Sequence, residues 1–318
     1  MSRLPDFFLV GAPKCGTSAL HAALARHPGL FLCEPKEPKF FLTDGPPPTS
    51  GGGPGDVPTW REHVWRRDDY EALFAAAPAT ALCGESTVFY LYDRDAQARI
   101  RKLVPDARLV AVLRDPAERA HSNWMHLRDA GLEPEADFAT ALDREPERIA
   151  AGWAHFWHYA ALGRYGEQLE HLFGLFPCEQ VLLIRYRDLR DAAAATVDRV
   201  CRFLGIAEHL VSHIPRDNSR SYAEPGWRTA VFGRTVRAGA WLGQFAPPEV
   251  WRAASVPITA RLSSGDSHRP KLAPEARARL LPHFEEDIAL LSELTGEAFA
   301  LWRSAESRGS FEQRVAAR

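Results

Sequence analysis

The sequence predicts an α/β protein with a P-loop-like three-layer fold, in which a central parallel sheet is flanked by helices. Short apolar runs alternate with stretches of helical periodicity, as in parallel strands joined by right-handed crossovers. The first apolar run, residues 7–10, leads through a glycine-bounded turn into a helix that carries Leu20 and Leu24. Strand, turn and helix in this order form an element that binds phosphate groups.

The remaining elements follow from local patterns along the chain. Residues 108–113 give the clearest strand, because a continuous apolar run suits a parallel strand that is covered on both faces. The helix after it has Asp115 as N-cap, Pro116 at its first position and Glu118 completing a capping box. Further strands are expected at residues 30–32, 81–85 and 180–186, and further helices at 68–77, 95–103, 165–173, 192–203 and 274–294.

Two segments have no clear periodicity. Residues 43–58 are rich in proline and glycine and are expected to form a long mobile loop. Residues 211–270 are polar and rich in arginine and proline, and we expect an irregular or partly helical cap there. With 318 residues and no internal repeat, we expect one domain over residues 1–318.

Composition indicates an ordinary globular protein of the cytoplasm. The residues are 46% hydrophobic and 25% charged, and no stretch approaches the ~18 apolar residues of a membrane span. The first strand starts at Phe7, so no signal peptide is expected. Five cysteines without a C-x-x-C pattern argue against a disulfide framework or a zinc site. The net charge of −2 argues against binding of nucleic acid, so any anion site must be built locally.

The turn after the first strand resembles a P-loop with one difference. Gly11 and Gly16 have the G-x-x-x-x-G spacing, but Thr17 occupies the usual lysine position and the lysine lies inside the loop, at Lys14. Backbone N–H groups, hydroxyls and this lysine would together bind an anion. The alternative is a glycine turn with an exposed lysine.

Arg114 and Ser122 form a second candidate anion site. Arg114 lies at the carboxyl end of the clearest strand, where ligands bind in open α/β sheets, and Ser122 lies about two turns into the next helix. One phosphate group could contact both side chains. The alternatives are a surface ion pair of Arg114 with Asp115 or Glu118, and a solvated position for Ser122.

Residues 34–41 form a third candidate, in which two glutamates alternate with two lysines before Phe40 and Phe41. A carboxylate at a strand end, beside an anion site, is suited to act as a general base. The alternative is a solvated run of charges.

Weaker candidates are Glu85 and the pair His155 and His158. Glu85 follows a strand and either faces the same cleft or belongs to a polar turn. The two histidines lie among aromatic residues, which indicates a packing face more often than a metal or catalytic pair. No acidic residue is placed as a Walker B acid, so no metal is expected and ATP hydrolysis is poorly supported.

Taken together, these motifs resemble those of the sulfotransferases that use 3′-phosphoadenosine 5′-phosphosulfate (PAPS). Residues 13–18 resemble the loop for the 5′-phosphosulfate, and residues 113–122 resemble the motif for the 3′-phosphate. Residues 37–41 are similar to the E-x-x-F-F of Golgi-type heparan sulfate sulfotransferases, and residues 163–169 and 186–189 are similar to bacterial members.

The resemblance implies a role for particular residues. Glu37 would be the catalytic base, and Lys14 would stabilise charge on the bridging oxygen as the product PAP leaves. Arg114 and Ser122 would bind the 3′-phosphate, and Arg269 would contact the cofactor. The other implied cofactor-binding residues, in the 5′-phosphosulfate loop, are Lys14, Cys15, Gly16, Thr17 and Ser18.

Two departures bear on the acceptor. Heparan sulfate enzymes have an E-K-T-P segment, whereas this chain has Glu85-Ser86-Thr87-Val88, and their K-G-R segment is replaced here by residues 265–270. Both changes argue against a heparan-like polymer as substrate. Glu85, His155 and His158 remain candidate substrate contacts.

The predicted activity is transfer of the sulfuryl group from PAPS to a hydroxyl or amine of a small-molecule, lipid or carbohydrate acceptor. The alternatives are a P-loop nucleotide kinase and a non-catalytic nucleotide-binding protein. The sequence does not identify the acceptor or the oligomeric state.

Overall fold

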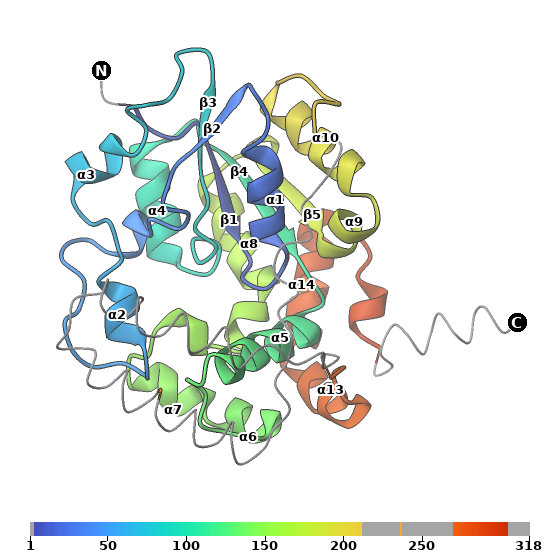
Figure 1. The fold of residues 1–318 in the computed structure, drawn as a ribbon. Helices are drawn as coiled ribbons and strands as arrows, with labels where there is room; N and C mark the ends of the chain where they lie inside the picture. Colours follow the sequence, from blue (N-terminus) through green and yellow to red (C-terminus); the bar gives the residue numbers. More distant parts are fainter. Residues whose placement is uncertain (1–2, 212–235, 237–269, 305–318) are drawn as a thin grey trace, which may run out of the picture. The chain divides into compact units, whose positions relative to one another are not determined.

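The computed structural model describes residues 3–211, 236 and 270–304 of the chain (Figure 1). The chain divides into two compact units, each built from segments that are far apart in the sequence. Unit 1 comprises Met1–Pro47, Glu62–Arg114 and Glu167–Ser219, and unit 2 comprises Pro48–Arg61, Asp115–Gly166 and Arg220–Arg318. Because neither unit is one continuous stretch, the expectation of a single domain stays a prediction.

A five-stranded parallel sheet forms the centre of unit 1, with strand order β2-β3-β1-β4-β5. All five residues of β1 are buried, as are all of β4 except its first residue, which agrees with apolar strands covered on both faces. The strands are β1 (Phe7–Gly11), β2 (Leu30–Leu32), β3 (Leu82–Glu85), β4 (Arg108–Leu113) and β5 (Val181–Arg185).

Strand β1 lies between β3 and β4 in the sheet. Phe8 of β1 pairs with Glu85 of β3 on one side and with Leu109 of β4 on the other. In such a sheet, ligands bind at the carboxyl ends of the strands, at the point where the strand order reverses. Here that point is at β1. The residues that follow β1, β3 and β4 are therefore the ones to inspect for a site.

The helices of unit 1 flank the sheet, and nearby capping residues define where some of them begin and end. Asp93 accepts a hydrogen bond from the Ala96 N–H at 2.8 Å and caps α4, and Gly205, with φ 71°, ends α10 as expected. The helical segments of this unit are α1 (Thr17–Leu24), the 3₁₀ helix η1 (Phe40–Leu42), α3 (Arg67–Ala72), α4 (Arg94–Leu103), η4 (Cys178–Gln180), α9 (Tyr186–Asp191) and α10 (Ala193–Leu204). Helix α8 (Tyr165–Leu175) begins in unit 2 and continues into unit 1.

Unit 2 is helical in its described part. Asp115 caps α5 by accepting the Glu118 N–H at 3.0 Å, with Pro116 in the first turn, which confirms the predicted start of this helix. Its helical segments are α2 (Asp56–Trp60), α5 (Pro116–Asp129), α6 (Phe138–Asp143), α7 (Glu145–Ala150), η2 (His155–Trp157), η3 (Ala161–Gly163), α13 (Pro274–Leu280), η5 (Leu281–His283), α14 (Glu285–Thr295) and η6 (Ala300–Trp302).

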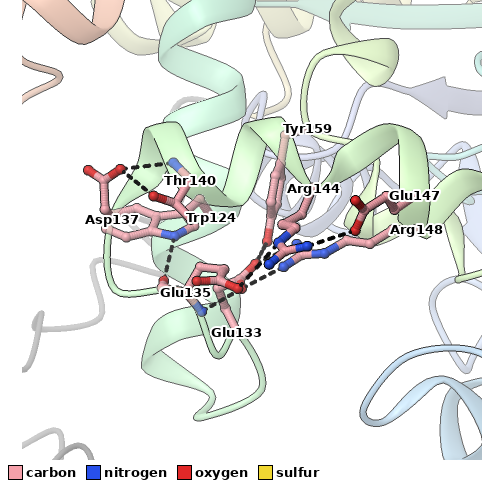
Figure 2. A network of polar contacts seen from close by, with 9 residues as sticks. All are labelled: Trp124, Glu133, Glu135, Asp137, Thr140, Arg144, Glu147, Arg148 and Tyr159. Carbon is pink, nitrogen blue, oxygen red and sulfur yellow. Dashed lines mark hydrogen bonds and ion pairs between the residues drawn. The ribbon is translucent and has the colours of Figure 1, made fainter.

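A buried ion pair organises the first half of unit 2 (Figure 2). The Arg148 guanidinium donates to both oxygens of Glu133, at 2.7 and 2.8 Å, and the Tyr159 hydroxyl donates to the same carboxylate. The Arg148 guanidinium also lies over the rings of Trp153 and Trp157, 5.1 Å from each centroid. A charge as deeply buried as Glu133 requires such a partner, and here the pair connects α7 to the aromatic segment after it.

Two expectations about these elements need correction. The single helix expected over residues 274–294 is wrong, because the chain forms α13, a 3₁₀ turn and α14, with Pro282 at the break. Proline has no N–H and clashes with the carbonyl four residues earlier. The proline-rich segment 43–58 also contains the start of a helix, α2, whose first residue Asp56 is buried. Whether the rest of that segment is mobile stays a prediction.

Among the described residues, no helix is long and apolar enough to cross a membrane. The cap expected over residues 211–270 lies outside the described residues, apart from residues 211, 236 and 270.

Candidate active site

The loop after β1 has the form expected of an anion-binding turn. Strand β1 ends at Gly11, the Ala12 N–H donates to the Val112 carbonyl of β4 at 2.9 Å, and Gly16 caps α1. The first N–H groups of a helix lack carbonyl acceptors from a preceding turn. In α1 the Ala19 and Leu20 N–H groups both donate to the Gly16 carbonyl, and the first turn has no acidic side chain. This helix start therefore favours an anion, because the helix dipole adds positive potential at that end.

Both glycines of the loop are required by their surroundings. A Cβ on Gly11 would lie 2.8 Å from the Leu91 Cβ, which is closer than real contacts allow. Gly16 has φ +83°, and a Cβ there would lie 3.1 Å from the Tyr186 ring and from Leu189. The loop is therefore held against the start of α9, a contact that the sequence motif alone does not reveal.

Arg114 reaches the loop from the end of β4. Its Nη1 donates to the Lys14 carbonyl at 3.4 Å, and its guanidinium lies over the Tyr186 ring, 4.9 Å from the centroid. The Arg114 side chain thus contacts the backbone of the loop that carries Lys14, and a joint role of the two residues in anion binding stays a prediction. Tyr186 is a part of this site that the sequence reasoning missed, although it stands in the motif that resembles bacterial sulfotransferases.

Ser122 and Arg269 are not placed in this arrangement. Ser122 lies on α5, is 4% exposed and belongs to unit 2, so its pairing with Arg114 stays a prediction. Arg269 lies outside the described residues. The thiol of Cys15, in contrast, is buried and donates to the Pro13 carbonyl at 3.6 Å, which gives this loop residue a structural contact.

Glu37 lies on a segment that is only partly exposed. Its Oε1 accepts from the Lys36 Nζ at 2.6 Å, and the two side chains are 24% and 22% exposed. Glu37 and Lys39 both have a left-handed backbone, with φ 62° and φ 61°. This geometry argues against the alternative of a fully solvated run of charges, since Lys39 itself is 7% exposed.

His21 links the loop helix α1 to the Glu37 segment electrostatically. Its Nδ1 lies 2.8 Å from the Ser86 Oγ, and the ring is buried. Burial, followed by the charge of Lys36, lowers the pKa of His21 to about 4, although Glu37 opposes the shift. The imidazole is therefore neutral at pH 7. The sequence did not predict that His21 lies near Lys36 and Glu37, because a single histidine on an apolar helix gives no functional signal.

Glu85 is completely buried in the described structure. Its carboxylate accepts hydrogen bonds from the hydroxyls of Tyr70, Thr87 and Tyr90, with the Thr87 contact at 2.6 Å. Burial raises the pKa of Glu85 to about 7, with the hydrogen bonds opposing the shift. A buried and fully bonded carboxylate is poorly placed to contact a substrate, which was the role expected from the sequence.

His155 and His158 lie in unit 2 as an aromatic pair. Their rings are 5.6 Å apart, and His158 Nε2 lies 3.1 Å from the Trp153 carbonyl oxygen. Burial lowers the pKa of each imidazole to about 4, so both are neutral at pH 7. This environment resembles the packing face that the sequence favoured, and a contact with substrate stays a prediction.

The same segment is anchored by Asp56 at the start of α2. Its carboxylate accepts from the Gly53 N–H at 2.6 Å, the Ala154 N–H at 2.8 Å and the Trp157 indole at 2.8 Å. These bonds join two stretches about a hundred residues apart within unit 2.

The strand order and the glycine-bounded loop define an α/β protein of the P-loop-like class. Residues 97–222 match the family described as "Sulfotransferase domain". A solved sulfotransferase from Alicyclobacillus acidocaldarius is 27% identical, with a TM-score of 0.71, and the match covers 95% of this chain and 100% of that one.

Curated relatives give the same assignment. The chain is 30% identical over 218 residues to the mouse bifunctional heparan sulfate N-deacetylase/N-sulfotransferase 3, covering 65% of this chain and 23% of the relative. It is 28% identical over 205 residues to the human heparan sulfate glucosamine 3-O-sulfotransferase 3B1, covering 64% and 47%. The chain thus spans less than half the length of these relatives. Over these regions the chain is similar to sulfotransferases.

Proposed function

We propose that this protein transfers the sulfuryl group of PAPS to a hydroxyl or amine of a small-molecule, lipid or carbohydrate acceptor. The observation that carries the proposal is the hydrogen bond from the Arg114 guanidinium, at the carboxyl end of β4, to the Lys14 backbone carbonyl in the loop after β1. The family assignment supports the same reaction, and it does not favour a nucleotide kinase.

The residues present suit a nucleotide with two anionic groups. Gly16 is the N-cap of α1, so the backbone amides of Gly16, Thr17 and Ser18 lie at a helix start, which favours binding of the 5′-phosphate. Arg114 offers a planar guanidinium for the 3′-phosphate, with Ser122 as its expected partner. Cys15 contributes its backbone to the loop, while its thiol is occupied by Pro13.

In the proposed reaction, Glu37 accepts the proton of the acceptor as the acceptor oxygen or nitrogen bonds to sulfur. The bond from sulfur to the bridging oxygen breaks, and its electron pair stays on the 5′-phosphate of PAP. Lys14 stabilises that developing charge, as a fixed cation aimed at the leaving oxygen. Lys36 keeps a positive charge beside Glu37 before the proton arrives.

One position after β3 bears on the class of acceptor. Ser86 occupies the position where the resemblance would place a lysine, and its hydroxyl is used by His21. The resemblance to heparan sulfate enzymes therefore breaks down at this position, which argues against a heparan-like polymer. The five free cysteines agree with a reducing compartment, and we propose a cytoplasmic location.

Calorimetry and a sulfation screen test the proposal together. We expect the protein to bind PAP without Mg²⁺ and to bind ATP–Mg²⁺ much more weakly. We also expect PAPS-dependent sulfation of a compound in fractionated cell extract, detected by mass spectrometry as a gain of sulfate mass. Tight binding of ATP–Mg²⁺ without PAP binding would favour a kinase, and PAP binding without any sulfation would favour a non-catalytic role.

Two variants test the proposed chemistry. Lys14→Ala is expected to lower kcat on the order of 10²-fold, as for loss of a donor to the transition state. Glu37→Gln is expected to keep PAP affinity and lose turnover. Lys102→Ala on α4 and Glu179→Gln on η4 are matched controls, because both side chains are exposed and lie away from the loop in sequence. Wild-type turnover in either test variant would remove that residue from the mechanism.

A further inference from the structure

The segment that carries Glu37 has a backbone that needs support from its surroundings. Glu37 and Lys39 are both left-handed, and neither is glycine. Such residues persist only where neighbouring contacts hold them. The Val64 N–H donates to the Pro38 carbonyl at 2.9 Å and Arg99 Nη1 donates to the Phe41 carbonyl at 2.7 Å. Two further hydrogen bonds run from this segment to side chains that follow β3.

Those two hydrogen bonds connect the segment to different hydroxyl groups. The Lys39 N–H donates to the Thr87 Oγ1 at 3.2 Å, and the Phe41 N–H donates to the Tyr90 hydroxyl oxygen at 3.2 Å. A hydroxyl that accepts in this way directs its own proton elsewhere. In both cases the proton goes to one carboxylate, that of Glu85.

Aromatic contacts complete the arrangement. Tyr70 also donates to Glu85, and its ring stacks on Phe40 with the centroids 4.1 Å apart and the planes at 7°. Phe41 lies edge-on to both Tyr70 and Tyr90. Glu85 is 0% exposed, so its three hydroxyl partners replace the water that it has lost.

We infer that Glu85 is a positioning residue: by accepting from Thr87 and Tyr90 it orients the two hydroxyls that hold the Lys39 and Phe41 amides, and so fixes the location of Glu37. This inference rests on the role proposed for Glu37 as base. Glu85 touches no reacting atom, and its effect on turnover passes entirely through the backbone of residues 37–41. The raised pKa of Glu85, which Glu37 increases further, agrees with two carboxyl groups held near one another.

Residue-specific amide exchange measured by NMR tests the inference without any acceptor. Thr87→Val is expected to remove the exchange protection of the Lys39 amide and to leave the Phe41 amide protected. Tyr90→Phe is expected to do the reverse. Glu85→Gln is expected to weaken the protection of both amides, because glutamine offers one acceptor oxygen to three hydroxyl donors.

Activity and PAP binding provide the second readout. In Glu85→Gln we expect calorimetric PAP affinity to stay within twofold of the wild type, while kcat in the extract-based sulfation assay falls by up to about 10²-fold. Glu145→Gln is the matched control, since Glu145 is another buried carboxylate, bonded in unit 2 to the Ala160 and Ala161 amides. It is expected to lower the unfolding temperature without changing exchange at Lys39 or Phe41.

The outcomes separate this inference from the proposed function. If the wild type sulfates nothing, the proposed function fails, and amide exchange still judges whether Glu85 holds the segment. If Glu85→Gln leaves both amides protected, or leaves kcat unchanged while they lose protection, the positioning role is wrong. If Glu85→Gln lowers PAP affinity and kcat in parallel, the residue supports the whole unit rather than Glu37.

Discussion

The largely buried ion pair of Arg277 with Asp115 in unit 2 is expected to be costly to break. The Arg277 guanidinium contacts both oxygens of Asp115, at 2.9 and 2.6 Å, and its side chain is 3% exposed. Its Nε also donates to the Ser304 carbonyl at 2.7 Å. Breaking a buried pair leaves an uncompensated charge, so Arg277→Met should cost about 3–5 kcal/mol.

A control lies on the same helix. Arg279 forms a pair with Asp143 at 2.7 Å, but the two side chains are 54% and 58% exposed. An exposed pair contributes at most about 1 kcal/mol. Urea unfolding should therefore separate Arg277→Met from Arg279→Met by roughly 2 kcal/mol or more, although both remove one arginine from α13.

A double-mutant cycle identifies the cause of the cost. Asp115 is also the N-cap of α5, and asparagine is an equally good N-cap. Asp115→Asn in the Arg277→Met background should recover roughly 2 kcal/mol, since it removes the stranded charge and keeps the cap. If the double variant is no more stable than Arg277→Met alone, or if Arg277→Met costs no more than Arg279→Met, the stranded-charge explanation is wrong.

The remaining predictions concern the loop, the Asp56 anchor and pH. Gly16→Ala should weaken PAP binding in calorimetry and lower the free energy of unfolding by about 1–2 kcal/mol, because a left-handed alanine would also press on Tyr186. Unchanged PAP affinity would contradict the tight packing of the loop. Asp56→Ala should destabilise by roughly 3 kcal/mol in urea unfolding, since it strands the Trp157 indole and two amides; a loss below about 1 kcal/mol would refute this. Because the pKa of Glu85 is raised to about 7, its contribution to stability is complete below its unfolded pKa near 4.5 and is lost as pH rises towards 7. The stability of the wild type relative to Glu85→Gln should therefore fall by on the order of 3 kcal/mol over that range, and a flat difference would contradict the burial of the charge.

The parts of the fold that the sequence predicted well are those set by neighbouring residues. Strands β1 and β4 are apolar runs, and their hydrophobic content is enough to place them in a parallel sheet that is covered on both faces. The caps at Asp115 and Gly205 are equally local, because each depends on residues within one helical turn. The break at Pro282 was also available from the sequence, and the amphipathic pattern on both sides of it led to the wrong prediction of one helix.

The parts that the sequence did not predict depend on contacts between distant residues. The sequence around Glu85 predicts a polar turn after a strand. Its burial depends on Tyr70 and on the chain near Phe40, and no sequence motif links either of these to Glu85. Asp56 lies in a proline-rich segment that favours a loop, yet its carboxylate is satisfied by donors about a hundred residues away. For the same reason the sequence named Lys14 and Arg114 but not the Tyr186 ring between the loop and the arginine.

Ion pairs near the proposed anion site bear on how a chain with a net charge of −2 would bind an anionic nucleotide. Asp115 follows Arg114 directly, and a bare carboxylate there would repel a phosphate on that arginine, but Arg277 neutralises it. Glu37 is likewise paired with Lys36, and Glu62 lies 3.8 Å from Lys39. Each of these three carboxylates therefore has a cationic partner of its own. Local pairing of this kind, rather than overall charge, sets the potential that a bound anion experiences.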